Sequence, residues 1–114
     1  MEENVISDRV VQYVMTMPDE GFAMLSVSGL ARWLKVDRYK LSRQFKSQKS
    51  MTLEFFLLKE RMSRAAFLLV SDGGMSVKEV SRKMGFCTCD YFIRVFREYY
   101  GIVPGRFQEF KNRR

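Results

Sequence analysis

Two stretches of the chain repeat one another: 26–46, SVSGLARWLKVDRYKLSRQFK, and 76–97, SVKEVSRKMGFCTCDYFIRVFR. Aligned from their first residues, with one residue inserted after the first helix, each predicts a short capped helix, a tight turn and a second helix. A small residue, Ala31 or Ser81, holds the same place in both first helices and allows the second helix to approach closely. The repeat therefore predicts two helix-turn-helix units.

The second helix of each unit carries the same outward cations. Its inner face is apolar, so its charged residues must face solvent, because an unpaired buried charge is costly. The matching cations are Arg43 and Lys46 in the first unit and Arg94 and Arg97 in the second. A simple duplication of a helical hairpin would preserve the apolar positions but would not require these cations. The two basic helices therefore favour DNA as the partner.

The remaining segments predict an all-α chain with short connections. Apolar residues at helical spacing predict helices over residues 4–17 and 52–70, with turns at 18–21 and 72–74, and Pro104 begins a short last helix. The long middle helix, about 28 Å in length, divides the chain into a first subdomain (1–51), a linker helix (52–71) and a second subdomain (72–114). Second helices separated by about that length can enter major-groove segments about 34 Å apart.

Composition supports a basic binding protein. The 114 residues include 20 Lys and Arg against 13 Asp and Glu, which gives a net charge of +7. Such an excess favours an acidic partner. Between Arg32 and Lys49 there are seven basic residues and one acid. No apolar run is long enough to span a membrane, so we expect a soluble, cytoplasmic chain with no membrane partner.

Catalytic and metal chemistry is not expected. The chain has no histidine, which removes the commonest general base and metal ligand. No nucleophile–base pair or glycine-rich phosphate loop is present, so we expect no enzyme and no cofactor. Cys87 and Cys89 lack the two further soft ligands of a zinc site. They are either free structural cysteines, the interpretation we favour, or redox-sensitive thiols near a helix start.

The chain resembles the DNA-binding domain of AraC/XylS-type transcription regulators. The resemblance covers about residues 5–110 and is most specific over 85–104, with the motifs Gly85-Phe86, Tyr91-Phe92-Ile93-Arg94-Val95-Phe96-Arg97, Tyr99-Tyr100-Gly101 and Pro104. It implies two helix-turn-helix subdomains joined by a linker helix, about seven helices in all, double-stranded DNA as partner and activation through bacterial RNA polymerase. Many members also carry an effector or dimerisation domain. This chain is therefore a stand-alone regulator or part of a longer one, and by itself we expect a monomer.

The resemblance also implies which residues contact DNA. The implied base-reading positions are Arg38, Tyr39, Ser42 and Arg43 in the first unit and Thr88, Cys89, Asp90, Ile93 and Arg94 in the second. Arg43 and Arg94 are the strongest of them, because a guanidinium can form two hydrogen bonds to guanine O6 and N7. Phosphate contacts are expected from Lys40, Lys46 and Arg97.

Two departures from the family pattern affect these expectations. Ser50 stands where the family usually has glycine, so we expect the turn after the first basic helix to be strained or differently shaped. Asp90 stands where an uncharged polar residue is usual. It either accepts a hydrogen bond from cytosine N4 or, as we favour, stabilises a helix start. The alternative function is a protein-interaction module that binds an acidic partner through the same basic face.

Overall fold

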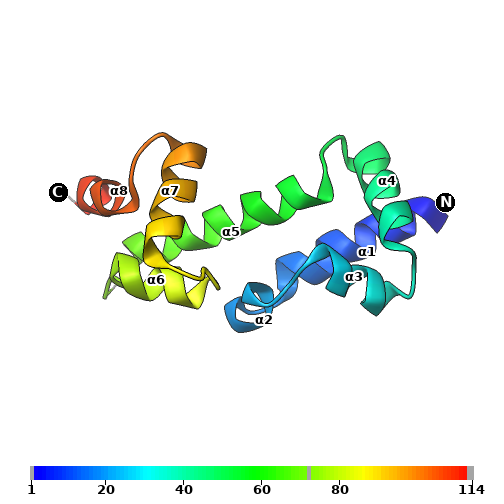
Figure 1. The fold of residues 1–114 in the computed structure, drawn as a ribbon, viewed down its shortest axis with the longest axis horizontal. Coiled ribbons are helices and arrows are strands. Elements are labelled where there is room, and N and C mark those ends of the chain that lie inside the picture. The colour runs from blue at the N-terminus through cyan, green and yellow to red at the C-terminus, as the bar shows by residue number, and fades with distance from the viewer. Residues whose placement is uncertain (1, 72, 113–114) are drawn as a thin grey trace. The chain divides into compact units, whose positions relative to one another are not determined.

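The computed structural model describes residues 2–71 and 73–112, which form eight helices and no strand. The helices are α1 (Glu2–Thr16), α2 (Asp19–Ala23), α3 (Val27–Leu34), α4 (Arg38–Lys49), α5 (Leu53–Val70), α6 (Val77–Lys83), α7 (Cys89–Tyr100) and α8 (Pro104–Lys111) (Figure 1). The predicted all-α fold with two helix-turn-helix units is confirmed. Within the described residues, no helix is both long enough and apolar enough to cross a membrane.

Five helices begin where the sequence predicts, because a side-chain oxygen caps each one. The capping bonds run to Ser26 from the amide of Gly29 (3.0 Å), to Asp37 from Lys40 (3.0 Å), to Thr52 from Phe55 (3.0 Å), to Ser76 from Glu79 (3.0 Å) and to Thr88 from Tyr91 (3.1 Å). Each bond satisfies an amide that the first turn of a helix leaves unpaired. The local sequence therefore determines where these helices start.

The helix α2 is the main difference from the sequence prediction. We expected residues 18–21 only to end the first helix, but a short helix covers Asp19–Ala23, which raises the count from about seven to eight. Pro18 lies in an extended conformation immediately before it, and two acidic residues occupy its first turn, where the helix dipole favours them. The Phe22 side chain is fully buried, and its burial stabilises this short helix.

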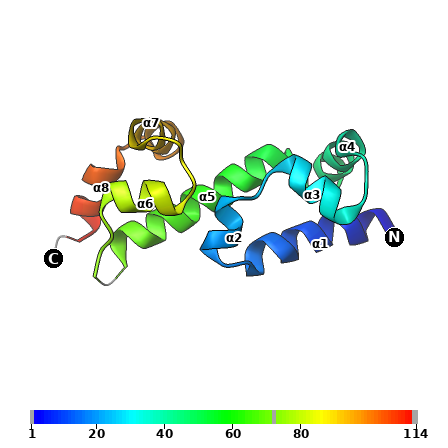
Figure 2. The ribbon, with the colours of Figure 1, turned by 60° about the horizontal axis from the view of Figure 1, so that its bottom comes forward.

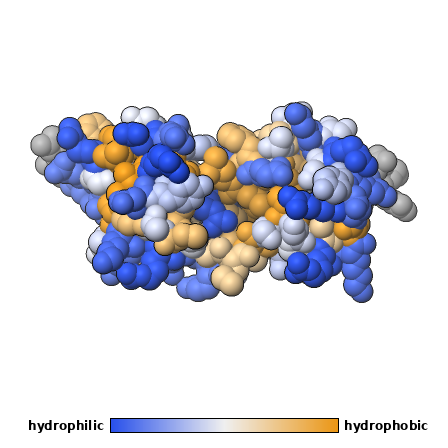
Figure 3. All heavy atoms as spheres, in the orientation of Figure 1, coloured by the Kyte–Doolittle hydropathy of each residue, from blue (hydrophilic) through white to orange (hydrophobic). Residues whose placement is uncertain are grey.

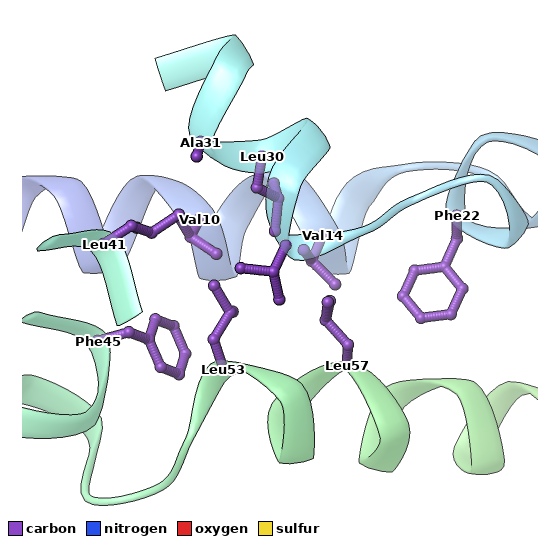
Figure 4. Close-up of a cluster of buried hydrophobic side chains, with 10 residues drawn as sticks. Val10, Val14, Phe22, Leu30, Ala31, Leu41, Phe45, Leu53 and Leu57 are labelled. Atoms are coloured by element: carbon purple, nitrogen blue, oxygen red, sulfur yellow. The ribbon is translucent and has the colours of Figure 1, made fainter. Parts of the chain in front are cut away.

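By internal contacts the described chain falls into two units, residues 1–60 and 61–114, with the boundary inside α5. In the first unit α1 supplies Val10 and Val14, and α5 directs Leu53 and Leu57 toward them (Figure 4). The other core side chains drawn there come from α2, α3 and α4: Phe22, Leu30, Ala31, Leu41 and Phe45. Phe45 is fully buried, as predicted for the inner face of the second helix.

Three contacts join α1 to α3 and α4 in the first unit. The ring of Tyr13 stacks on Trp33 of α3 at 4.0 Å between centroids, and the Arg9 guanidinium lies 5.4 Å from the centre of the Trp33 ring. The ammonium of Lys49 at the end of α4 forms an ion pair of 2.6 Å with Asp8. These contacts hold the helix-turn-helix formed by α3 and α4 against α1.

The second unit has an aromatic core. Phe92 and Phe96 of α7 are fully buried and their ring centroids are 5.7 Å apart. Phe107 of α8 contacts Phe96 at 5.5 Å. The Gln108 amide nitrogen donates to the carbonyl oxygens of Leu69 (2.8 Å) and Met75 (2.7 Å). The last helix is thereby fastened to the segment between α5 and α6.

Arg61 of α5 contacts the end of α6. Its guanidinium donates a hydrogen bond of 2.5 Å to the carbonyl oxygen of Met84. Burial, and then the nearby charge of Arg64, lower the pKa of Arg61 from its ordinary value. Arginine nevertheless stays charged, because its ordinary pKa is far above neutrality.

The two helix-turn-helix turns have the same geometry, which confirms the repeat in three dimensions. The carbonyl of the small buried residue accepts a hydrogen bond from the residue five positions later, Ala31 from Val36 (3.0 Å) and Ser81 from Phe86 (3.1 Å). In both views α4 follows α3 across this turn, as α7 follows α6 (Figure 2). The turn requires a left-handed residue, which is Lys35 (φ 59°) in one unit and Gly85 (φ 84°) in the other.

Candidate nucleic-acid interface

The second helix of the first unit, α4, separates buried and exposed residues cleanly. Leu41 and Phe45 face the core, with relative exposures of 1% and 0%. The opposite face exposes Arg38, Tyr39, Lys40, Arg43 and Lys46, and Ser42 is half-buried beside them. Tyr39 is 70% exposed, so its ring is not needed for the core. The predicted DNA-contacting residues of this unit therefore share one accessible helix surface.

This surface of α4 keeps its positive charge. Lys49 is the one basic residue between Arg32 and Lys49 that forms an ion pair within the described residues. Its partner Asp8 comes from α1, forty-one positions away in sequence. In Figure 3, hydrophilic residues cover much of the surface over α4. Unneutralised cations on an exposed helix give the electrostatic attraction that a polyanion requires.

A hollow of about 470 Å³ lies beside the basic face of the first unit. It is lined by Ser42, Arg43, Lys46, Ser47, Thr52 and Glu54. Two of the predicted DNA-contacting cations, Arg43 and Lys46, thus face the same open space between α4 and the start of α5.

The second helix of the second unit, α7, is built in the same way. Phe92 and Phe96 face the core, whereas Arg94 and Arg97 are exposed at the positions that match Arg43 and Lys46. Ile93, directly before Arg94, is half-buried. The outward orientation predicted for the repeated cations is confirmed in both units.

The start of α7 carries the other predicted residues of the second unit. Thr88 accepts the capping bond with its hydroxyl oxygen and keeps its hydroxyl hydrogen for another acceptor. Asp90 is exposed in the first turn of α7, a position where the helix dipole favours a negative charge. Cys89 is half-buried next to it. All three residues lie at the same end of the helix.

Sequence reasoning missed Tyr91 as part of this surface. The Tyr91 ring is 47% exposed, and the guanidinium carbon of Arg94 lies 5.3 Å from its centre. The available signal was the three-residue spacing of an aromatic residue and an arginine on one helix, which places their side chains together.

Comparisons with known proteins agree with this geometry. A family model described as "Helix-turn-helix domain" matches residues 30–109. The "Virulence regulon transcriptional activator VirF" of Shigella flexneri is 36% identical over 81 residues, which cover 71% of this chain and 30% of VirF. The "Probable transcription factor PqrA" of Proteus vulgaris is 29% identical, and the match covers 96% of this chain and 87% of PqrA. The chain belongs to the AraC-type helix-turn-helix family.

A solved structure shows the same arrangement for the AraC-type domain. The C-terminal domain of AraT, a response regulator from Geobacillus stearothermophilus, superposes with a TM-score of 0.81 at 28% identity, covering 92% of this chain and 84% of that one. Members of this family are DNA-binding transcription regulators and not enzymes. The AraC-type domain spans about 30% of the length of VirF.

The two cysteines of the AraC-type domain lie at the start of α7. Both are free thiols, Cys87 exposed and Cys89 half-buried. They line a hollow of about 190 Å³ together with Lys78 and Arg82. Within residues 2–71 and 73–112, no group of three or more potential ligands could hold a metal ion.

Proposed function

We propose that this chain is a sequence-specific, double-stranded DNA-binding domain that reads two successive major-groove segments with α4 and α7. One observation carries the proposal. Arg43 and Lys46 on α4 recur as Arg94 and Arg97 on α7, and all four side chains are exposed on the second helix of a helix-turn-helix unit. In this motif the second helix is the one that enters the major groove.

The proposal assigns different roles to the two cations of each helix. Residues near the start of a recognition helix reach deepest into the groove. Arg43 and Arg94 therefore read bases, since guanidinium matches guanine O6 and N7. Lys46 and Arg97 lie one turn later and contact phosphates, as does Lys40. The other proposed base-reading residues are Arg38, Tyr39, Ser42, Thr88, Cys89, Asp90 and Ile93.

Tyr39 has two suitable partners within this scheme. Its exposed ring can pack on a thymine methyl group, and its hydroxyl can donate to a phosphate oxygen. In this proposal residues 1–51 and 72–114 act as two DNA-binding subdomains, with residues 52–71 as the linker helix between them.

The test is a competition titration on a site selected from random duplexes. Arg43→Ala or Arg94→Ala should lose about 1–3 kcal/mol of binding free energy and relax preference at one or two base positions. Each change should affect a different half-element of the site. The matched control Lys46→Ala should weaken all duplexes equally and lower the salt slope by about one.

Two outcomes would contradict this assignment. If Arg43→Ala weakened all duplexes equally while Lys46→Ala changed base preference, the two roles would be reversed. If neither substitution mattered, the first unit would not read DNA. If the affinity for duplex DNA did not change with salt concentration, the alternative function, a module that binds an acidic protein partner, would be favoured.

We further propose that the chain activates transcription in the cytoplasm through bacterial RNA polymerase, binding its site as a monomer. The name of VirF as a transcriptional activator supports activation. Transcription with purified polymerase from a promoter carrying the selected site should rise when the protein is added. Sedimentation of the protein with its duplex should give one protein per two-element site.

A further inference from the structure

Tyr91 is an exposed aromatic residue beside Arg94 on α7. The ring is 47% exposed, although it lies next to the fully buried Phe92. An aromatic ring that kept a purely structural role would gain more from deeper burial. The guanidinium of Arg94 lies over this ring, with its central carbon 5.3 Å from the ring centre.

The Tyr91 ring is held in place from the core outward. Phe86, in the turn before α7, contacts the buried Phe92 with 5.0 Å between ring centroids. Phe86 in turn contacts Tyr91 at 5.8 Å, with the two rings tilted by 60°. The backbone amide of Tyr91 donates to the hydroxyl of Thr88 over 3.1 Å. The contact with Phe86 and the capped start of α7 thus restrict the position of the Tyr91 ring.

A guanidinium stacked on a ring keeps its hydrogen-bonding edge free. The attraction to the ring acts through the flat face of the guanidinium, whereas its five N–H donors point outward in its plane. An unsupported arginine side chain has many rotamers and loses that freedom when it binds. The Tyr91 ring removes part of this freedom before DNA arrives and leaves the donors available for a base.

The first unit lacks this support. The repeat places Lys40 where Tyr91 stands in the second unit. Within the described residues, Arg43 stacks on no aromatic ring and instead borders the open hollow between α4 and α5. The two equivalent arginines are therefore ordered to different degrees.

We propose that Tyr91 is a positioning residue that orients Arg94 for base recognition, and that α7 therefore reads its base with a preordered arginine while α4 does not. This inference rests on the proposed base-reading role of Arg94. Tyr91 acts through Arg94 and makes no base contact of its own.

The experiment is a double-mutant cycle on the DNA site selected by the unmodified protein. Binding to that site and to its single-base variants is compared for the wild type, Tyr91→Leu, Arg94→Ala and the double variant. Tyr91→Leu should reduce preference for the base read by Arg94 about two- to fivefold, the range for an exposed cation–π contact. In the Arg94→Ala background, Tyr91→Leu should have no further effect. Tyr91→Phe keeps the ring and should retain the wild-type preference.

Several results would overturn the inference. If Tyr91→Leu kept wild-type base preference while Arg94→Ala lost it, Tyr91 would not position Arg94. If Tyr91→Leu weakened binding equally with and without Arg94, Tyr91 would contact DNA itself. Unchanged base preference in Arg94→Ala would instead refute the proposed reading role of Arg94. Melting temperatures exclude misfolding, and Tyr91→Met serves as a second ring-free variant if the leucine variant melts early.

Discussion

At the scale of single residues, the two recognition helices end in the same conformation but with different residues. Ser50 ends α4 with φ 62°, and Gly101 ends α7 with φ 80°. Both amides donate to the carbonyl four residues earlier, Ser50 to Lys46 (2.9 Å) and Gly101 to Arg97 (2.7 Å). The expected alternative, a differently shaped turn at Ser50, is wrong, because the serine adopts the same left-handed conformation as the glycine. That conformation is costly for any residue with a Cβ atom.

Replacing Ser50 by glycine and Gly101 by serine should change the free energy of unfolding in opposite directions. Ser50→Gly should stabilise the first unit by about 1 kcal/mol, and Gly101→Ser should destabilise the second by about as much. A Cβ atom added at Gly101 meets no atom within 4 Å, so the cost there comes from the backbone alone. Chemical denaturation of both variants measures the changes. Two shifts of the same sign would contradict the backbone explanation.

A second single-residue effect concerns the cap of α6. The Glu79 carboxylate accepts a hydrogen bond of 2.8 Å from the backbone amide of Ser76, and Ser76 accepts one of 3.0 Å from the Glu79 amide. The bond from the Ser76 backbone is the main cause that lowers the pKa of Glu79, and the bond with the Ser76 side chain adds to it. The carboxylate form is therefore favoured in the folded state.

This cap should make α6 sensitive to acid. Because the pKa of the Glu79 carboxyl is lower in the folded state, this carboxylate stabilises the fold fully above its unfolded pKa of about 4.3. That stabilisation is lost as the pH falls through the folded pKa. Glu79→Gln keeps an oxygen acceptor at every pH. In thermal melts from about pH 6 to about pH 3, the melting temperature of the wild type should fall relative to that of Glu79→Gln as the pH decreases. A constant difference would mean that the carboxylate does not hold the cap.

At the scale of elements, a buried phenylalanine near the middle or end of each recognition helix packs it against neighbouring elements. Phe45 contacts Phe56 of α5 with 5.3 Å between ring centroids, and Phe96 contacts Phe92, Tyr100 and Phe107. Both rings are fully buried. A recognition helix can present its cations in one orientation only while this inner face stays packed.

Truncation of these rings should therefore melt the element that carries the cations. Phe96→Ala or Phe45→Ala should cost about 3–5 kcal/mol of unfolding free energy. Circular dichroism and thermal melting measure the loss, and Phe110→Ala, at a side chain that is 67% exposed, is the control. If Phe96→Ala melted like the wild type, our placement of α7 against its core would be wrong.

At the scale of the whole molecule, charge is the property that binding should reveal first. The chain has a net charge of +7. Exposed cations on both recognition helices can neutralise several phosphates, each with release of a counterion. Affinity for duplex DNA should therefore depend on salt.

If about six phosphates are neutralised, affinity should fall about a thousandfold between about 50 and 200 mM salt. A titration of one duplex at several salt concentrations gives the slope directly. A control titration with Lys46→Ala should give a shallower slope. A flat response for the wild-type protein would contradict groove binding.

Much of this molecule follows from its sequence alone. Residues within four positions of one another determine the caps at Ser26, Asp37, Ser76 and Thr88 and the periodicity of the recognition helices, because these interactions are local. The repeat also predicts that Arg43 and Arg94 face outward, since the residues two positions before and two positions after each of them fill the core.

The tertiary structure alone decided the features that depend on which elements meet. The short helix α2 forms because Phe22 enters a core made by α1, α3, α4 and α5. Asp8 forms an ion pair with Lys49 only because α1 lies beside the end of α4. Local sequence determines helix starts and faces, whereas contacts between distant residues require the packed fold that brings them together.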